Sequence, residues 1–148
     1  TEAGPLIGGI VKSTLAFSAL LKEGIGNTVR VSLSSPMENE VITAREILRE
    51  VGLRSGGVKI VSCPRCGRNG FDVHGFINRW EKELLSMDKN ITVAVMGCVV
   101  NGPGEGKHAD IGITGAGDKV TIFKHGKIVQ TVSADSADTV FRKELLSL

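Results

Sequence analysis

Three cysteines are the side chains of this sequence best suited to metal or redox chemistry. Cys63 and Cys66 stand in the stretch SCPRCGRNG, and Cys98 stands in the stretch GCVVNGPGEG. An isolated CxxC pair is weak evidence for any function, but a third cysteine in a loop rich in glycine and proline makes the pattern more specific. Three thiols cannot all pair with one another as disulfides, so the sequence favours a metal site or catalysis.

Three kinds of site are compatible with these cysteines. A redox dithiol of the thioredoxin type uses Cys63 and Cys66 and leaves Cys98 without a role. A structural zinc ion needs a fourth ligand, for which the sequence offers His74 or His108. An iron-sulfur cluster takes all three thiolates as ligands and often has a proline beside one of them.

The sequence gives the iron-sulfur alternative additional support. Pro64 directly follows Cys63, and Glu105 stands seven positions after Cys98, at the end of the same loop. The fourth iron of a cluster can take a harder oxygen ligand, and Glu105 is the candidate that this loop offers. The glycines of this loop would let backbone amides approach an inorganic core closely. An ordinary turn with a surface glutamate is the alternative for the loop.

The sequence around the CxxC pair is basic. The segment between residues 50 and 72 contains four basic residues and no acidic one, namely Arg54, Lys59, Arg65 and Arg68. Cations beside a cluster with anionic ligands would stabilise its reduced form and could attract an acidic electron donor. A solvated basic loop is the alternative for each of them.

The elements that must position the cysteines form a predicted α/β domain over residues 54–148. A short strand at 58–61 leads to Cys63, and the apolar run ITVAVM at 91–96 indicates a strand, buried on both faces, that leads to Cys98. If these strands are parallel neighbours, their carboxyl ends bring the three thiols to one edge of the sheet.

The rest of this domain follows from hydrophobic spacing and turn residues. We expect a helix from Val73 to Met87, a strand near 110–114, a hairpin around His125-Gly126 and a last helix capped by Asp135.

Residues 1–53 predict a helix, a strand and a second helix joined by short loops. The first helix is expected after Gly8-Gly9, over about residues 10–23, and the strand over Thr28–Leu33. Such units build parallel α/β sheets and barrels. Because one strand cannot make a barrel, we interpret the chain as a piece of a longer protein.

The second helix of this segment has recognisable ends. Ser35 and Glu38 predict a capping box at its start, and Gly52 is placed to end it. The apolar face of the helix is predicted from helical spacing to consist of Val41, Ala44, Leu48 and Val51.

Composition excludes several other classes of function. The formal net charge is only +2 and aromatic residues make up 4% of the chain, so neither charge nor stacking surface favours a nucleic-acid partner. No segment approaches the about 20 apolar residues of a membrane span, and the amino-terminal stretch lacks the pattern of a signal peptide. We therefore expect a soluble cytoplasmic protein.

Five motifs, in order along essentially the whole chain, together resemble a known family. They are TEAG at 1–4, VKS at 11–13, EGIGNTVRVSL at 23–33, CPRCGR at 63–68 and GCVVNGPGE at 97–105. They resemble the carboxyl-terminal portion of the 4-hydroxy-3-methylbut-2-enyl diphosphate synthases of the non-mevalonate isoprenoid pathway. The last of these motifs is highly specific.

The resemblance implies a fold and a cofactor. Residues 1–53 would be the last units of a (β/α)₈ barrel, and residues 54–148 would be a sulfite-reductase-like α/β domain that holds a [4Fe-4S] cluster. The resemblance implies that the cluster ligands are Cys63, Cys66, Cys98 and Glu105.

The resemblance also implies a reaction and its partners. The family converts 2-C-methyl-D-erythritol 2,4-cyclodiphosphate to 4-hydroxy-3-methylbut-2-enyl diphosphate by two-electron reductive ring opening and dehydroxylation. Reduced ferredoxin or flavodoxin supplies the electrons, and the enzyme is a homodimer. A chain without most of the barrel is expected to be inactive alone.

Four residues outside the thiols are implied to act on the substrate. Glu2, after the seventh barrel strand, resembles the acid that faces the reacting carbon. Arg30 and Ser32, two apart on the eighth strand, resemble diphosphate-binding residues, and Asn101 would lie near the substrate oxygens. The alternatives are a zinc-stabilised binding module, which would hold no sulfide, and a ferredoxin-like electron carrier, which would not need Glu2 or Arg30.

Overall fold

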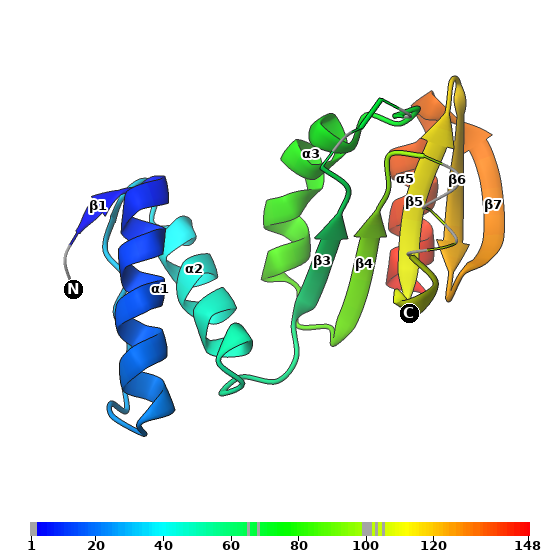
Figure 1. Cartoon of the computed structure of the whole chain (residues 1–148). Coiled ribbons are helices and arrows are strands. Elements are labelled where there is room, and N and C mark those ends of the chain that lie inside the picture. The colour runs from blue at the N-terminus through cyan, green and yellow to red at the C-terminus, as the bar shows by residue number, and fades with distance from the viewer. Residues whose placement is uncertain (1–2, 65, 68, 99–101, 103, 105) are drawn as a thin grey trace. The chain divides into compact units, whose positions relative to one another are not determined.

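The structure, a computed structural model shown in Figure 1, describes the whole chain except residues 1–2, 65, 68, 99–101, 103 and 105. It divides into two compact units, Thr1–Gly56 and Gly57–Leu148. Both units combine helices with strands, so the predicted α/β class is confirmed. The elements are, in chain order, β1 (Gly4–Pro5), α1 (Leu6–Lys22), β2 (Leu33–Ser34), α2 (Glu38–Glu50), β3 (Val58–Ser62), α3 (Val73–Ser86), β4 (Ile91–Val95), η1 (Gly106–His108), β5 (Ile111–Ala116), β6 (Lys119–Lys124), β7 (Lys127–Ser133) and α5 (Ala134–Leu146).

The first unit is a β-α-β crossover followed by a helix. Strands β1 and β2 pair in parallel, with Gly4 opposite Leu33, and α1 connects them. A Cβ atom on Gly9 of α1 would lie 2.5 Å from Cδ2 of Leu33, so the missing side chain lets the helix approach the strand closely. The buried core of this unit consists of Val31, Leu33 and Ile47.

Two predictions for the first unit are wrong in part. Helix α1 begins at Leu6 rather than near residue 10, because Gly8 and Gly9 lie inside it and Gly9 is needed there for close packing against Leu33. The predicted strand Thr28–Leu33 is hydrogen-bonded only from Leu33, since the described part of its neighbour β1 offers only two residues for pairing.

Helix α2 ends as predicted but begins and packs differently. The residue after its last turn, Gly52, has a φ of 79°, which confirms the predicted stop. The predicted capping box is absent: Met37 is the N-cap residue, and Ser35 Oγ instead accepts a hydrogen bond of 2.7 Å from Asn39 Nδ2. The N-cap residue thus lies two positions after the predicted one.

The buried face of α2 also differs from the predicted one. Its buried side chains are Thr43 and Ile47, whereas Val41 is 53% exposed. Ala44 packs against the small core as expected. Hydrophobic spacing alone could not identify this face because the helix also carries apolar side chains, such as Val41, on a side that stays exposed.

The second unit is built on one sheet with the strand order β3-β4-β5-β6-β7. Strands β3, β4 and β5 are parallel, and β6 and β7 continue the sheet antiparallel (Figure 1). The predicted strands, the hairpin at His125-Gly126 and helix α3 are confirmed within a few residues. The predicted cap is wrong for the last helix, because Ser133 precedes α5 and Asp135 lies in its first turn.

Helices α3 and α5 cover one face of this sheet. Phe76 and Trp80 of α3 meet Phe141 of α5, with ring centroids 5.1 Å apart in both pairs and the planes nearly perpendicular. Edge-to-face contacts of this kind are favourable arrangements of aromatic rings. Together with the inward side chains of β4, β5 and β6 they form the main core of the chain.

A second, smaller core lies on the opposite face of the sheet. Ala94, Met96, Ala109 and Phe123 form a second buried cluster, with Cys63 packed against it. A Cβ atom on Gly106 would lie 2.5 Å from the Phe123 ring, and one on Gly112 would lie 2.2 Å from it. The ring therefore fills a slot between β5 and η1 that only glycines leave open.

None of the helices described by the structure combines the length and the apolar character that a membrane crossing requires.

Candidate functional site

Cys63 and Cys98 lie at the carboxyl ends of neighbouring parallel strands. Residues 58–62 of β3 pair with residues 91–95 of β4, and the amide of Cys63 continues this ladder by donating to the carbonyl of Val95 at 3.0 Å. The predicted neighbourhood of the two strands is thus confirmed. Cys98 is buried, Cys63 is half-buried and Cys66 is exposed, and all three thiols are free.

The loop after β3 is attached to the residue that precedes Cys98. The amides of Gly70 and Phe71 both donate to the carbonyl of Gly97, at 2.7 and 3.2 Å. Within the loop, the amide of Asn69 donates to the carbonyl of Cys66 at 3.0 Å. These bonds hold the CxxC loop and the start of the Cys98 loop against each other.

Two side chains converge on Gly97. A Cβ atom on this glycine would lie 2.6 Å from Asn69 Oδ1 and 3.5 Å from Cys63 Sγ. The Asn69 oxygen is buried and has no hydrogen-bond partner among the described residues. A buried amide without a partner is unusual in a native protein and suggests that a group is missing from its surroundings.

A second unpartnered polar atom lies beneath the loop that follows Cys98. The amide of Gly102 donates to the carbonyl of Cys98 at 3.0 Å, and a Cβ atom on Gly102 would lie 2.7 Å from Cγ2 of Thr114. The Thr114 hydroxyl on β5 is buried and also has no partner within the described part of the chain. Unsatisfied polar atoms therefore belong to side chains that lie against Gly97 and Gly102, which precede and follow Cys98 in the sequence.

The far end of the Cys98 loop is held on the sheet. Gly106 packs against Phe123. Asp110 is bonded twice to Thr92: the Thr92 amide donates to Asp110 Oδ2 at 2.7 Å, and the Asp110 amide donates to the Thr92 carbonyl at 3.0 Å. The loop is thus fixed at its start by Gly97 and at its end by Gly106 and Asp110.

A single metal ion has no ready site among these residues. Within the described ranges, no three or more Cys, His, Asp or Glu side chains converge as ligands of one ion. His74 and His108, the candidate fourth zinc ligands, are both exposed. A cubane cluster makes a different demand, because it binds each thiolate through a different iron and its ligands need not converge on one point.

Several predicted site residues lie outside the described residues, namely Glu2, Asn101, Glu105, Arg65 and Arg68. Of the remaining basic residues, Lys59 is the second residue of β3, at the end opposite Cys63. Four residues of extended strand correspond to about 13 Å, which is beyond the screening distance of about 8 Å at physiological salt. Lys59 is therefore poorly placed to act on the Cys63 thiol.

Arg30 and Ser32 lie in the extended segment that leads to β2. Arg30 is exposed and Ser32 is half-buried, and they alternate with the buried side chains of Val31 and Leu33. The two polar residues therefore share the side of the segment opposite the small core.

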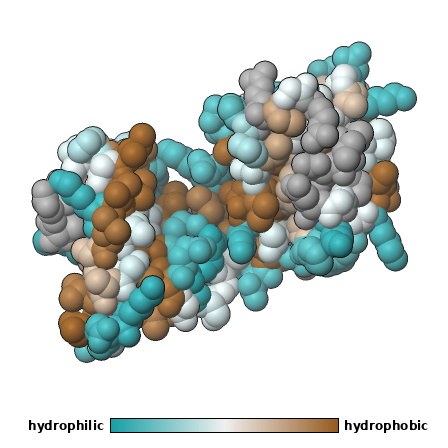
Figure 2. All heavy atoms as spheres, in the orientation of Figure 1, coloured by the Kyte–Doolittle hydropathy of each residue, from teal (hydrophilic) through white to brown (hydrophobic). Residues whose placement is uncertain are grey.

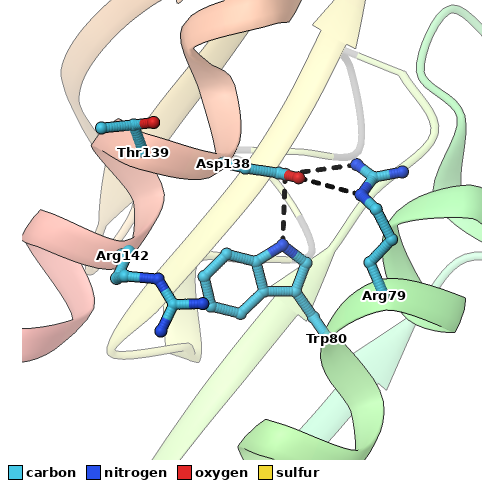
Figure 3. A pocket seen from close by; sticks show the side chains of 5 residues that line it. All are labelled: Arg79, Trp80, Asp138, Thr139 and Arg142. Carbon is cyan, nitrogen blue, oxygen red and sulfur yellow. Dashed lines mark hydrogen bonds and ion pairs between the residues drawn. The ribbon is translucent and has the colours of Figure 1, made fainter.

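A surface pocket lies elsewhere in the second unit, between α3 and α5. It has a volume of about 250 Å³ and is lined by Arg79, Trp80, Asp138, Thr139 and Arg142 (Figure 3). Asp138 accepts hydrogen bonds from Arg79 Nε at 2.8 Å and from Trp80 Nε1 at 3.1 Å. The Arg142 guanidinium lies 4.6 Å from the Trp80 ring centroid.

The charges of this pocket are already paired. Arg142 donates to both oxygens of Glu83, and the hydrogen bond to Asp138 raises the pKa of Arg79. Burial raises the pKa of the Asp138 carboxyl, but the hydrogen bonds and charges of the surrounding cations outweigh it, and the pKa lies below its usual value. These side chains therefore connect α3 to α5, and their cations are engaged with carboxylates rather than available to a ligand. We call the group of Arg79, Trp80, Asp138 and Arg142 the clasp between the two helices.

Sequence reasoning missed Asn69 and Thr114. Neither belongs to a metal-ligand pattern, and a polar residue in a loop or on a strand is most often solvated. The signal appears only when the fold places both side chains, without hydrogen-bond partners, beside the cysteine loops.

Comparison with protein families gives two matches along the chain. Residues 59–147 match the family model described as the GcpE protein C-terminal domain. Residues 1–45 match the one described as the GcpE TIM-barrel domain.

Curated relatives with the name 4-hydroxy-3-methylbut-2-en-1-yl diphosphate synthase (flavodoxin) match the whole chain. The protein from Treponema pallidum (strain Nichols) is 66% identical over 100% of this chain and 39% of its own length. The one from Treponema denticola is 60% identical over 100% of this chain and 41% of its own length. That from Geobacillus thermodenitrificans is 46% identical over 98% of this chain and 39% of its own length. The chain thus spans about two fifths of the length of these relatives.

Proposed function

The chain belongs to the GcpE family, and on that premise we propose that it is the carboxyl-terminal part of a 4-hydroxy-3-methylbut-2-en-1-yl diphosphate synthase. The substrate of the complete enzyme is 2-C-methyl-D-erythritol 2,4-cyclodiphosphate, and the reaction is its two-electron reductive ring opening and dehydroxylation. The observation that carries this proposal is the attachment of the Cys63-Cys66 loop to Gly97, beside Cys98, in a chain that matches both domains of the family.

A [4Fe-4S] cluster is the cofactor of this proposal, with Cys63, Cys66, Cys98 and Glu105 as its ligands. When bound, such a cluster supplies electrons one at a time. The donor set fits the group because the three thiols are free and follow two adjacent strands. The unpartnered Asn69 and Thr114 side chains support the same conclusion, since each lies where a bound group could complete its hydrogen bonding.

The domain assignment follows from the same proposal. Residues 54–148 form the cluster domain, of the sulfite-reductase-like fold, and residues 1–53 are the last units of the TIM barrel. The parallel pairing of β1 with β2 through the crossover helix α1 supports the barrel assignment.

The substrate-binding residues lie in the first unit and in the cluster loop. Arg30 and Ser32 bind the diphosphate, because a guanidinium presents paired donors to phosphate oxygens. Glu2 donates a proton at the reacting carbon, and Asn101 contacts the substrate oxygens. The position of Arg30 on the exposed side of the segment, opposite the small core, supports its role.

The proposed partners follow from the names of the relatives and from the fact that the chain spans only part of their length. Flavodoxin is the electron donor that those names print, and ferredoxin is the alternative donor. The complete enzyme acts as a cytoplasmic homodimer. The chain alone lacks the greater part of the barrel, so it is inactive by itself.

Iron and acid-labile sulfide analysis tests the cofactor. The chain is prepared without oxygen, reconstituted with iron and sulfide, and compared with Cys63→Ser and Cys98→Ser variants. The expected result is about four irons and four sulfides per chain, with a strong loss in both variants. One zinc ion without sulfide would contradict the proposal and support a zinc-stabilised module instead.

Replacement of Gly97 tests the geometry of the site. A Cβ atom on Gly97 would lie 2.6 Å from Asn69 Oδ1 and 3.5 Å from Cys63 Sγ, so Gly97→Ala should push the cysteine loop away. We expect about tenfold weaker cluster retention with unchanged far-ultraviolet circular dichroism. Gly104→Ala is the matched control in the same loop, because its Cβ atom would meet nothing within 4 Å. Equal cluster retention in both variants would show that Gly97 is not part of the site.

The activity itself is tested with the complete enzyme. Turnover of the cyclic diphosphate with reduced flavodoxin is expected for the full-length protein and absent for residues 1–148. Full-length protein that binds a cluster and transfers electrons but leaves the cyclic diphosphate unchanged would identify an electron carrier instead.

A further inference from the structure

Asn69 is a polar residue of the loop after β3 that has no role in the proposed ligand set and whose side-chain oxygen is buried. It lies three residues after Cys66, and its backbone amide closes a turn onto the Cys66 carbonyl. The following amide, that of Gly70, is bonded to Gly97. The backbone on both sides of the side chain is therefore fixed, and the side chain has little freedom to turn toward solvent.

The amide of Asn69 and the thiol of Cys63 border the same space. Asn69 Oδ1 and Cys63 Sγ lie 2.6 and 3.5 Å from the point where a Gly97 side chain would begin. Gly97 leaves that point empty, and it directly precedes the buried Cys98. The side-chain amide thus lies beside the residue that joins β4 to Cys98, close to the Cys63 thiol.

The chemistry of an asparagine side chain suits this position. Its amide carries an oxygen that accepts and an NH₂ group that donates, and a half-turn about the Cβ–Cγ bond exchanges them without other movement. Thiolates and the sulfides of a cluster only accept hydrogen bonds. The buried Oδ1 finds no donor among the described residues, so the orientation that places the NH₂ group toward sulfur costs no existing hydrogen bond.

We infer that Asn69 donates a hydrogen bond from Nδ2 to the Cys63 thiolate of the bound cluster and raises the cluster's reduction potential. This inference rests on the proposed function, because it requires the cluster. A donor beside sulfur stabilises the more negative, reduced state, and hydrogen bonds to sulfur are one of the main ways in which proteins adjust such potentials.

The test is a potentiometric titration of the reconstituted full-length protein, followed by electron paramagnetic resonance. Asn69→Val removes the hydrogen-bond donor. Asn69→Thr introduces a side chain of nearly the same shape as valine that carries a hydroxyl donor. Asn78→Val, on the exposed face of α3, is the matched control. We expect Asn69→Val to lower the ratio of reduced to oxidised cluster about tenfold at a fixed potential, which for one electron is about 59 mV. Asn69→Thr should recover part of this loss, and Asn78→Val should titrate like the wild type.

Iron content provides a second measurement if a variant fails to retain the cluster. Loss of the cluster in Asn69→Val with retention in Asn69→Thr would support the hydrogen bond. Equal loss in both variants would show that Asn69 acts by packing and would overturn the inference, as would identical potentials in all three proteins. A wild-type protein that takes up no iron and sulfide would instead refute the proposed function.

Discussion

The two units of the chain bury their apolar side chains to very different extents. The second unit encloses Phe76, Phe141 and Leu145 completely, each with an exposed fraction of 0%. In the first unit, Ile7 and Leu15 on α1 are 79% and 70% exposed. Figure 2 shows the resulting apolar strip over this helix. The second unit therefore has a complete core of its own, whereas the first needs further chain to cover it.

This difference agrees with what each unit matches. Nearly all of the second unit, over residues 59–147, matches one family domain, whereas residues 1–45 match a TIM-barrel domain, and the chain spans 39% of the length of its T. pallidum relative. A barrel is stabilised by closure, since each strand and helix is covered by its neighbours. A segment taken from the end of a barrel keeps its local helices and turns but loses the neighbouring strands and helices that would cover its apolar side chains.

Separating the units should produce the largest effect. Residues 57–148 alone should unfold cooperatively in urea with a free energy of about 5 kcal/mol, the lower range for small domains. Residues 1–56 alone should show no cooperative transition, because their core consists of only a few side chains. Circular dichroism and amide dispersion in NMR spectra measure both, and a sharp transition in the smaller piece would refute the contrast.

The second largest effect should be a difference in the free energy of unfolding that is lost when core side chains of the two units are truncated. Phe141→Ala is expected to lower the free energy of unfolding by about 3–5 kcal/mol, because the ring contacts both Phe76 and Trp80. Ile47→Ala should cost about 2 kcal/mol or less, as the open unit can collapse around it. Urea denaturation reports the first and hydrogen exchange in α2 the second. Similar losses would mean that the first unit is as tightly packed as the second.

The apolar strip on α1 should drive self-association of this chain. Ile7, Val11 and Leu15 follow one another at four-residue spacing and so share a helix face. Replacing all three by Gln should weaken association about tenfold, or about 1.4 kcal/mol, in sedimentation experiments. Ala16→Gln, at an exposed position on another side of the helix, provides the control. Unchanged association in the triple variant would place the contact elsewhere.

The clasp between α3 and α5 should make the smallest contribution to the free energy of unfolding, and this contribution should depend on pH. The folded state lowers the pKa of Asp138, so the unfolded chain binds this proton more readily. The stabilisation is therefore complete above the usual carboxyl pKa and disappears as the pH falls through the lowered value. Asp138→Asn should cost less than about 1 kcal/mol at neutral pH, since the side chain is partly exposed.

The difference between Asp138→Asn and the wild type should then vanish in acid. Urea unfolding from neutral pH down to about pH 3 measures it, with the exposed Asp118→Asn as a variant of equal charge change. A difference that persists in acid would show that the carboxyl acts by shape rather than by charge.

The sequence predicted the second unit well because its patterns are local and mutually consistent. The run at 91–96 has the apolar continuity of a strand buried on both faces, and the helix ending near Met87 has one apolar side. Each element finds its partners within the same unit. Local preference and tertiary packing therefore agree.

The first unit was predicted less well for the opposite reason. Thr28–Ser32 has the composition of a strand, but pairing depends on neighbours, and β1 provides a ladder of only two residues. Gly8 and Gly9 suggested a boundary, whereas Gly9 is needed inside α1 for its approach to Leu33. Tertiary context overrides local preference at both places.

At the candidate site, the sequence indicates which residues are the proposed ligands, but it does not indicate which other side chains surround them. The CxxC spacing and the third cysteine point to Cys63, Cys66 and Cys98 as the proposed ligands. Asn69 emerges only from burial and from the missing partner of its amide. Which polar side chain faces a thiol depends on how two loops meet, and no local pattern encodes that.

The contact between Phe123 and Gly106 has a consequence for biogenesis. During synthesis the three cysteines emerge from the ribosome before Phe123, which lies 25 positions after Cys98. Until β6 is made, the turn at Gly106 has no ring to rest on, and the loop that follows Cys98 has no platform. The order of translation thus leaves a window in which all the thiols are exposed to oxidation while the surface that shapes their loop does not yet exist.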